Sequence, residues 1–242
     1  MKGDQEHGVA LDTFQKRLGI SFKDKTLLET AFTHRSYLNE TRSLAAKKNG
    51  REHNERLEFL GDAVLELVVT DLLFKQYPSA SEGDLTSYRA ALVNAVMLGG
   101  IAESLGMNEC LLLSRGEAKD TGRARATILA NTFEAVVGAL YLDQGIEEIF
   151  RFVATHVIPH MQEVLEHGTW RDSKSLFQEF AQAHYGITPT YKVLHAEGPD
   201  HDRHFTVGLS VGDADIARGE GKSKQDAEQD AARKALDESE KK

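Results

Sequence analysis

Apolar residues in the first part of the chain recur every three or four positions, as they do on the buried face of a helix. Leu11, Phe14 and Leu18 follow this spacing and predict a short helix that ends at Gly19. Residues 39–52 are polar and interrupt the pattern, which predicts a loop. The other helices that we expect lie at about residues 27–32, 54–76, 81–105, 126–142 and 146–157. Because no apolar–polar alternation occurs here, the first 165 residues or so are predicted to be all-α.

The pattern changes after about residue 170. Three short segments are typical of strands and are separated by glycine and aspartate turn formers: residues 190–196, 204–211 and 214–218. A helix that Ser173 caps precedes them, and a helix with an alanine-rich face follows at residues 224–236. We therefore predict an all-α domain at residues 1–167, a linker at 168–171 and a small α+β domain, in the order α-β-β-β-α, at 172–242.

Composition and charge narrow the classes of function. The chain has 29 basic and 38 acidic residues, and residues 172–242 alone have 10 basic and 14 acidic ones. Nucleic-acid binders are usually basic, so any contact with RNA must come from locally placed groups. Cys110 is the only cysteine, which excludes an intrachain disulfide and favours a reducing compartment such as the cytoplasm. We expect no secretory signal and no membrane span, because the most apolar stretch, residues 57–74, carries four acids.

Two predicted helices carry acidic side chains at helical spacing. Glu55, Glu58 and Asp62 share one face of the first helix, and the opposite face carries apolar residues: Leu57, Leu60, Val64 and Leu67. Asn131 and Glu134 lie one turn apart on the second helix, between apolar turns. Oxygen ligands from two facing helices would form a site suited to Mg²⁺, which could neutralise a phosphodiester during hydrolysis.

Each of these acids also has a simpler interpretation. Glu58 and Asp62 could lie on a solvated helix face, and Glu134 could form a buried ion pair with Arg56 or Arg125. The spacing alone therefore indicates a candidate metal site without a substrate.

The segment Asn-Glu-Arg-Leu-Glu-Phe-Leu-Gly-Asp at residues 54–62 resembles the signature motif of the ribonuclease III family. Further segments are similar to this family in the same order along the chain: residues 31–37, 81–85 and 128–135. The C-terminal region resembles a double-stranded-RNA-binding domain at residues 175–179, 198–201 and 219–224. The resemblance covers nearly the whole chain, and the nine-residue match with its acidic centre is highly specific.

The resemblance implies catalytic acids at Glu58, Asp62 and Glu134, which would bind Mg²⁺ together with the amide oxygen of Asn131. The family usually has an aspartate at the position of Asn131, so this chain lacks one ligand charge. Three further positions match the family: Glu55 and Glu82, which would line the cleavage valley, and Phe59, which would plug into the partner subunit of a homodimer. Glu82 could equally complement the dipole of a helix start, and Phe59 could be ordinary core.

The resemblance also implies an RNA surface on the C-terminal domain. Its predicted residues are Gln178 and Gln182 on the first helix, His201 in a turn, and Lys222, Ser223 and Lys224 at the start of the last helix. These groups suit the wide minor groove of A-form RNA and its phosphates. Because Gln225 stands where the family commonly has a second lysine, we predict weaker and more salt-sensitive binding than a more basic relative would show.

The activity implied by the resemblance is Mg²⁺-dependent hydrolysis of double-stranded RNA to 5′-phosphate and 3′-hydroxyl ends, in the maturation of ribosomal and messenger RNA. Two alternatives remain open. One is an RNA-binding regulator whose nuclease centre is impaired by Asn131. The other is a helical metal phosphohydrolase that acts on small nucleotides, for which residues 172–242 would have no role.

Overall fold

The computed structural model describes residues 2–40, 52–167, 173–199 and 203–239, and the chain forms two compact units, Met1–Trp170 and Arg171–Lys242. The described part of the first unit is helical, apart from one isolated bridge between Thr33 and Leu112. Its helices are α1 (Lys2–Leu18), α2 (Lys25–Ala31), α3 (Arg35–Glu40), α5 (Glu55–Gln76), α6 (Glu82–Val93), α7 (Ala95–Ser104), α8 (Arg123–Gln144), α9 (Ile146–His156) and α10 (Met161–His167), with short 3₁₀ turns at Met107–Cys110, Glu117–Lys119 and Ile158–His160.

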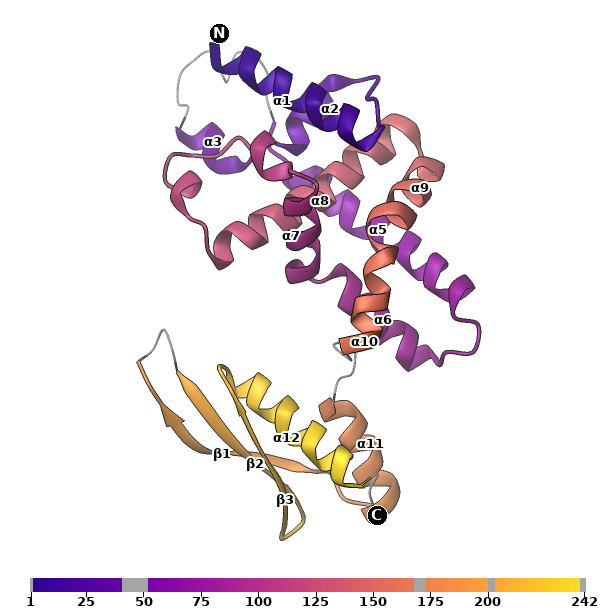
Figure 1. Ribbon diagram of the computed structural model, residues 1–242, viewed down its shortest axis with the longest axis vertical. Coiled ribbons are helices and arrows are strands. Elements are labelled where there is room, and N and C mark those ends of the chain that lie inside the picture. The colour runs from indigo at the N-terminus through magenta and orange to yellow at the C-terminus, as the bar shows by residue number, and fades with distance from the viewer. Residues whose placement is uncertain (1, 41–51, 168–172, 200–202, 240–242) are drawn as a thin grey trace. The chain divides into compact units, whose positions relative to one another are not determined.

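The two longest helices, α5 and α8, pack against each other at the centre of this unit (Figure 1). Helix α8 is buried over most of its middle, including Phe133, Val136 and Leu140. A helix that is apolar on nearly all sides must be surrounded by other elements, and α2, α7 and α9 pack against it. The packing therefore fixes α8, and the side chains that it carries toward α5, within the core.

Helix α5 has three faces rather than the two expected. Its buried strip contains Val64, Leu65 and Val68, and the acids lie on the strip beside it. Leu67, which the sequence pattern places on one face with Leu60 and Val64, is 62% exposed. At about 100° per residue, Leu67 lies well away from the centre of the buried strip. The acids therefore border the core instead of lying opposite it.

The region predicted as one helix at residues 81–105 consists of two helices, so this prediction is also wrong. The break is at Asn94, whose backbone is extended (φ −75°, ψ 159°). Its side-chain oxygen accepts hydrogen bonds from Val96 N at 3.1 Å and Met97 N at 3.0 Å, which caps α7. Its amide donates to the carbonyl oxygen of Ala91 at 2.8 Å, so that one side chain satisfies backbone groups of both helices. Ser81 and Asp84 form a capping box at the start of α6.

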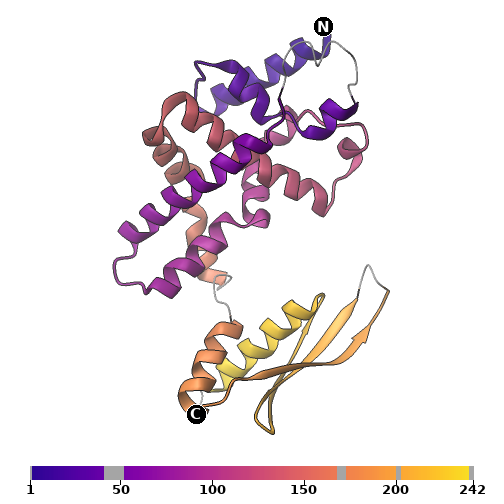
Figure 2. The ribbon, with the colours of Figure 1, turned by 180° about the vertical axis from the view of Figure 1, so that it is seen from behind.

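The second unit contains α11 (Ser173–Tyr185), β1 (Thr190–Glu197), β2 (His204–Val211), β3 (Ala214–Gly221) and α12 (Lys224–Ser239). The strands form an antiparallel sheet in the order β1-β2-β3, with a register shift in β1 between Val193 and His195. Both helices cover the same face of this sheet (Figures 1 and 2). The core between them contains Phe177, Leu209 and Ala231. The predicted fold class, all-α followed by α-β-β-β-α, is confirmed.

Two further sequence predictions concern membrane-spanning helices and the loop at residues 39–52. Within the described ranges no single helix has the length and apolarity to cross a membrane, although the bent pair α6 and α7 passes by length and composition. The loop predicted at residues 39–52 lies mostly outside the described residues, and its first two positions, Asn39 and Glu40, belong to α3.

Candidate active site

The start of α5 is fixed by Asn54, which is buried. Its backbone amide donates to the carbonyl oxygen of Thr33 at 3.0 Å, and its side-chain amide donates to that of Ala31 at 3.3 Å. Asn54 therefore ties the first turn of α5, and with it Glu55 and Glu58, to the end of α2.

Glu58 is half-buried on the strip of α5 that borders the core. Burial raises the pKa of its carboxyl group above the ordinary value, and the negative charges of Glu55 and Asp62 raise it further. A hydrogen bond from the side-chain amide of Asn131, on α8, acts in the opposite direction. Glu58 and Asn131, which the sequence predicted to share a site, therefore do lie together.

Glu134, one turn after Asn131 on α8, carries the most perturbed carboxyl group of this cluster. Burial is the main cause that raises its pKa to about 7, followed by the charges of Asp62, Glu58 and Glu66. Asp62 itself is exposed. Among the described residues no cation pairs with Glu134, so the predicted alternative of an ion pair with Arg56 or Arg125 is not observed. The charged groups that act on the half-buried Glu134 are therefore all acids.

This donor set fits a divalent cation chemically. Three carboxylates and an amide oxygen are the hard ligands that Mg²⁺ prefers, and a half-buried carboxylate without a counter-ion is costly unless a cation neutralises it. In the described part of the chain, however, no three histidine, cysteine, aspartate or glutamate side chains are grouped closely enough to hold a metal ion as they stand. The acids are close enough for their charges to raise the pKa values of Glu58 and Glu134, but their carboxyl groups would have to turn toward a bound ion.

The two acids predicted to line the cleavage valley, Glu55 and Glu82, are more exposed than Glu58 and Glu134. Glu55 is exposed and accepts a hydrogen bond from Arg35 at 3.2 Å, and its other oxygen is 3.8 Å from Nδ1 of His53. Glu82 is exposed in the first turn of α6. No interaction described for this chain joins Glu82 to Glu58 or Glu134, so its place in the cluster stays a prediction.

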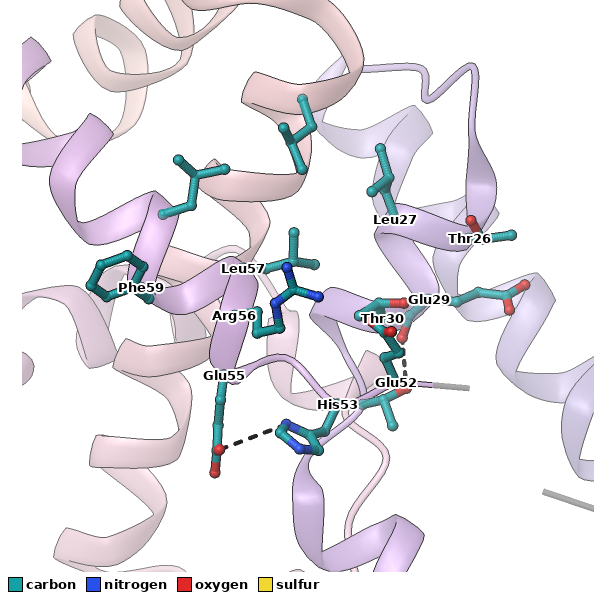
Figure 3. Close-up of a pocket in the computed structure, with 13 residues that line it drawn as sticks. Thr26, Leu27, Glu29, Thr30, Glu52, His53, Glu55, Arg56, Leu57 and Phe59 are labelled. Atoms are coloured by element: carbon teal, nitrogen blue, oxygen red, sulfur yellow. Dashed lines mark hydrogen bonds and ion pairs between the residues drawn. The ribbon is translucent and has the colours of Figure 1, made fainter. Parts of the chain in front are cut away.

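A pocket of about 1080 Å³ lies between α2 and the start of α5 (Figure 3). Figure 3 shows Phe59 at one edge of this pocket and Thr26 and Leu27 at the other. Phe59 is 82% exposed, so the alternative that it belongs to the core is excluded. Of the predicted acidic residues only Glu55 lines the pocket, which is therefore separate from the acidic cluster.

Of the predicted RNA-contacting residues of the second unit, the two glutamines and the two lysines are exposed, and Ser223 is half-buried. Gln178 and Gln182 lie on α11, and Lys222 and Lys224 flank the start of α12. Ser223 caps α12, because its hydroxyl accepts a hydrogen bond from Asp226 N at 3.1 Å and donates to Asp226 Oδ2 at 2.8 Å. His201 lies outside the described residues.

Sequence reasoning missed Glu66 as a member of the acidic cluster. Glu66 follows Asp62 by four positions on the same strip of α5, and its charge contributes to the raised pKa of Glu134. The signal was present, since the acids at positions 55, 58, 62 and 66 continue one helical spacing.

Comparison with known proteins identifies related sequences and structures. A family model described as Ribonuclease-III-like matches residues 24–161, and one described as Double-stranded RNA binding motif matches residues 173–239. Two proteins named Ribonuclease 3 are similar over most of their length. The one from Nitratiruptor sp. is 42% identical over 93% of this chain and 95% of its own length, and the one from Bacillus cereus is 44% identical over 97% and 94%.

A solved structure is also similar. It is the nuclease domain of ribonuclease III from Campylobacter jejuni, described as flexible in a region involved in dimer formation. It is 39% identical, with a TM-score of 0.51, and the match covers 59% of this chain and 92% of that one.

Proposed function

The chain belongs to the ribonuclease III family, and from that premise we propose that it cleaves double-stranded RNA by Mg²⁺-dependent hydrolysis to 5′-phosphate and 3′-hydroxyl ends. The observation that carries the proposal is the environment of the Glu134 carboxyl group. Its carboxyl group is half-buried, three other acids surround it, and its pKa is raised to about 7. Such an arrangement is unfavourable in the isolated protein and becomes favourable when a divalent cation neutralises it.

Each residue of the cluster has a proposed role. Glu58, Asp62 and Glu134 would hold Mg²⁺, which when bound supplies charge neutralisation at the scissile phosphate and a more acidic water. Asn131 orients the Glu58 carboxylate through its side-chain amide and leaves its amide oxygen for the remaining ligand position. Glu55 and Glu82 would line the valley around the phosphate, with Glu55 held in place by Arg35.

Cleavage of a long RNA duplex tests this proposal. We expect cleavage in Mg²⁺, none in EDTA, and products with a 5′-phosphate that a phosphatase removes and a 3′-hydroxyl that a polymerase extends. A single-stranded RNA of the same sequence serves as the control and should stay intact. Products with 3′-phosphate ends, or cleavage that persists in EDTA, would contradict the proposal.

We further propose that the protein works as a homodimer in which Phe59 enters the pocket of the partner subunit. Three large apolar side chains project from one face of α5: Phe59, Leu67 and Phe74 are 82%, 62% and 68% exposed. A row of this kind marks an interaction surface. The pocket beside Phe59 has the apolar lining that a phenyl ring needs, supplied by Leu27, Leu57, Leu60 and Leu142.

Sedimentation of the Phe59→Ala variant tests the dimer. Central aromatic residues of interfaces cost about 2 kcal/mol or more when truncated, so we expect the dimer dissociation constant to rise by about 30-fold or more. Val96→Ala, which removes an equally exposed side chain from α7, serves as the control. A Phe59→Ala protein that dimerises as tightly as this control would exclude the proposed contact.

The second unit would bind the duplex that the first one cuts. We propose that Gln178 and Gln182 contact the minor groove and that Lys222 and Lys224 contact phosphates at the start of α12. Ser223, which caps α12, would contribute to phosphate binding through the backbone at this helix start. The physiological substrates that we propose are precursors of ribosomal RNA and structured messenger RNA in the cytoplasm, and the buried thiol of Cys110 suits a reducing compartment.

The alternatives are not favoured. A non-catalytic regulator would not require three acids beside the half-buried Glu134. A phosphohydrolase of small nucleotides predicts full turnover after removal of residues 172–242, whereas we expect cleavage of duplex RNA to weaken without them.

A further inference from the structure

Two glycines lie at the point where α5 and α8 touch. Gly61 stands between Glu58 and Asp62 in the sequence, and Gly138 follows Glu134 by one helical turn. A side-chain carbon added at Gly61 would overlap the backbone carbonyl of Glu134, lying 2.6 Å from its carbonyl carbon and 2.8 Å from the amide nitrogen of Gly138. The backbone of one predicted ligand therefore rests directly on Gly61.

The contact at Gly138 is reciprocal. A side-chain carbon there would overlap the backbone carbonyl oxygen of Leu57 and lie 3.0 Å from the amide nitrogen of Gly61. Carbon atoms normally keep about 3.5–4.0 Å from non-bonded neighbours. At this crossing the two helices thus meet backbone to backbone, with no room for even a methyl group.

Glycine is unfavourable in the interior of a helix, because it loses more conformational freedom on folding than alanine does. Gly61 and Gly138 both lie in the interiors of long helices and have ordinary negative φ angles. A turn or a left-handed backbone therefore does not account for them. Gly100 on α7 gives a contrast, because an added side-chain carbon there meets nothing within 4 Å.

We propose that Gly61 and Gly138 are positioning residues that set the separation of the α5 carboxylates from Glu134, and thereby the affinity of the site for a divalent cation. The inference rests on the proposed function, since it concerns the same acids. It adds a role for two residues that carry no ligand atom.

The size of the displacement supports this role. Relieving the overlap at Gly138 requires the helices to separate by about 1 Å. Metal–ligand distances must be kept to within about 0.2 Å, so a shift of this size exceeds what the site tolerates. A side chain at Gly138 would push α8 away from α5 one turn after Glu134. A side chain at Gly61 would push directly on the backbone of Glu134.

The experiment compares Gly138→Ala with a matched variant at another helix crossing. A side-chain carbon at Gly99, on α7, would lie 2.7 Å from the carbonyl oxygen of Ala126 on α8. Ala126 is eight residues from Glu134, about 12 Å along the helix. Gly99→Ala therefore disturbs the packing of α8 without pressing on the acids.

Binding of Mn²⁺ to the full chain is measured by electron paramagnetic resonance without RNA, in buffer containing trimethylamine N-oxide to favour the folded state. We expect Gly138→Ala to bind Mn²⁺ about tenfold more weakly or worse, comparable to the loss of a residue that orients a ligand. Gly99→Ala should bind within about twofold of the wild type. Gly61→Ala, which presses on Glu134 most directly, should show the largest loss.

Several results would overturn the inference. One is Mn²⁺ affinity in Gly138→Ala equal to that of Gly99→Ala. Another is a Gly138→Ala chain that stays unfolded in trimethylamine N-oxide, because the glycine would then serve folding and not the site. In both cases a wild type that binds Mn²⁺ and cuts duplex RNA leaves the proposed function intact. A wild type that does neither contradicts the proposed function as well.

Discussion

The acidic cluster on α5 and α8 and the predicted RNA surface of the second unit differ in how their charges are held. Glu58 and Glu134 are half-buried, come from two packed helices and have raised pKa values. Gln178, Gln182, Lys222 and Lys224 are exposed; Lys222 precedes α12, and the other three lie on helices. Packing of the core fixes the side chains of the first site, whereas the second site consists of individual exposed side chains.

This difference determines what each site reveals about its ligand. Burying like charges together is costly, so the electrostatics of the acidic cluster favour a cationic ligand. Exposed lysines are stable without a partner, and Asp226 and Asp230 on α12 reduce the local positive potential. We therefore expect substitutions in the cluster to have large effects on chemistry, and substitutions in the RNA surface to have small effects on binding.

The largest effect is expected for Glu134→Gln, which keeps the shape of the side chain and removes its charge. Cleavage of duplex RNA in Mg²⁺ should fall by more than about 100-fold, beyond the range typical of residues that only support a ligand. RNA binding in EDTA should be unchanged, because the second unit provides it. The control is Glu103→Gln, an exposed glutamate of α7. Normal cleavage by Glu134→Gln would place the active site elsewhere.

The next effect concerns stability without metal. The folded pKa of Glu134, about 7, lies above its ordinary value of 4.5, so between these pH values the folded chain holds a proton that the unfolded chain has lost. The resulting stabilisation is complete below about pH 4.5 and disappears as the pH rises through 7.

In EDTA the wild type should therefore lose stability from pH 5 to pH 8 relative to Glu134→Gln. After allowance for solvent screening we expect the loss to be about 1–2 kcal/mol. Urea unfolding at a series of pH values measures it. Parallel curves for the two proteins would mean that Glu134 is not buried among other acids.

The smallest effect is expected on the RNA surface. Lys222→Ala should weaken duplex binding about twofold to fivefold at physiological salt, since an exposed ion pair contributes at most about 1 kcal/mol. The slope of log affinity against log salt should fall by about one unit. Lys192→Ala, an exposed lysine of β1, is the control and should change neither quantity. A loss in Lys192→Ala as large as in Lys222→Ala would indicate a diffuse surface without defined contacts.

Much of the fold could be predicted because helix ends and strand turns are encoded locally. Ser81 with Asp84 and the boundaries of β2 are examples where the residues themselves determine the structure. The break at Asn94 was missed because asparagine in an apolar pattern does not by itself end a helix. The exposure of Leu67 depends on which direction α5 faces in the core, and this is a property of the tertiary structure.

The candidate site was predictable to a similar degree. The spacing showed that Glu55, Glu58 and Asp62 share a strip of α5, and together with Glu134 it indicated a candidate metal site. The resemblance to a family added the assignment of individual ligands and of the substrate. The burial that raises the pKa of Glu134 arises only when α8 packs on α5, so the sequence could not show it. The same holds for the contact between Gly61 and Gly138.

The most direct test is a crystal of the full chain soaked in Mn²⁺ and measured for anomalous scattering. We predict a peak between α5 and α8, with oxygen atoms of Glu58, Asp62 and Glu134 about 2.0–2.2 Å away, near the distances that Mg²⁺ sites show. The same crystal form of Glu134→Gln should lose that peak. A wild-type crystal in which the ion binds elsewhere, with these carboxylates unoccupied at saturating Mn²⁺, would contradict the account.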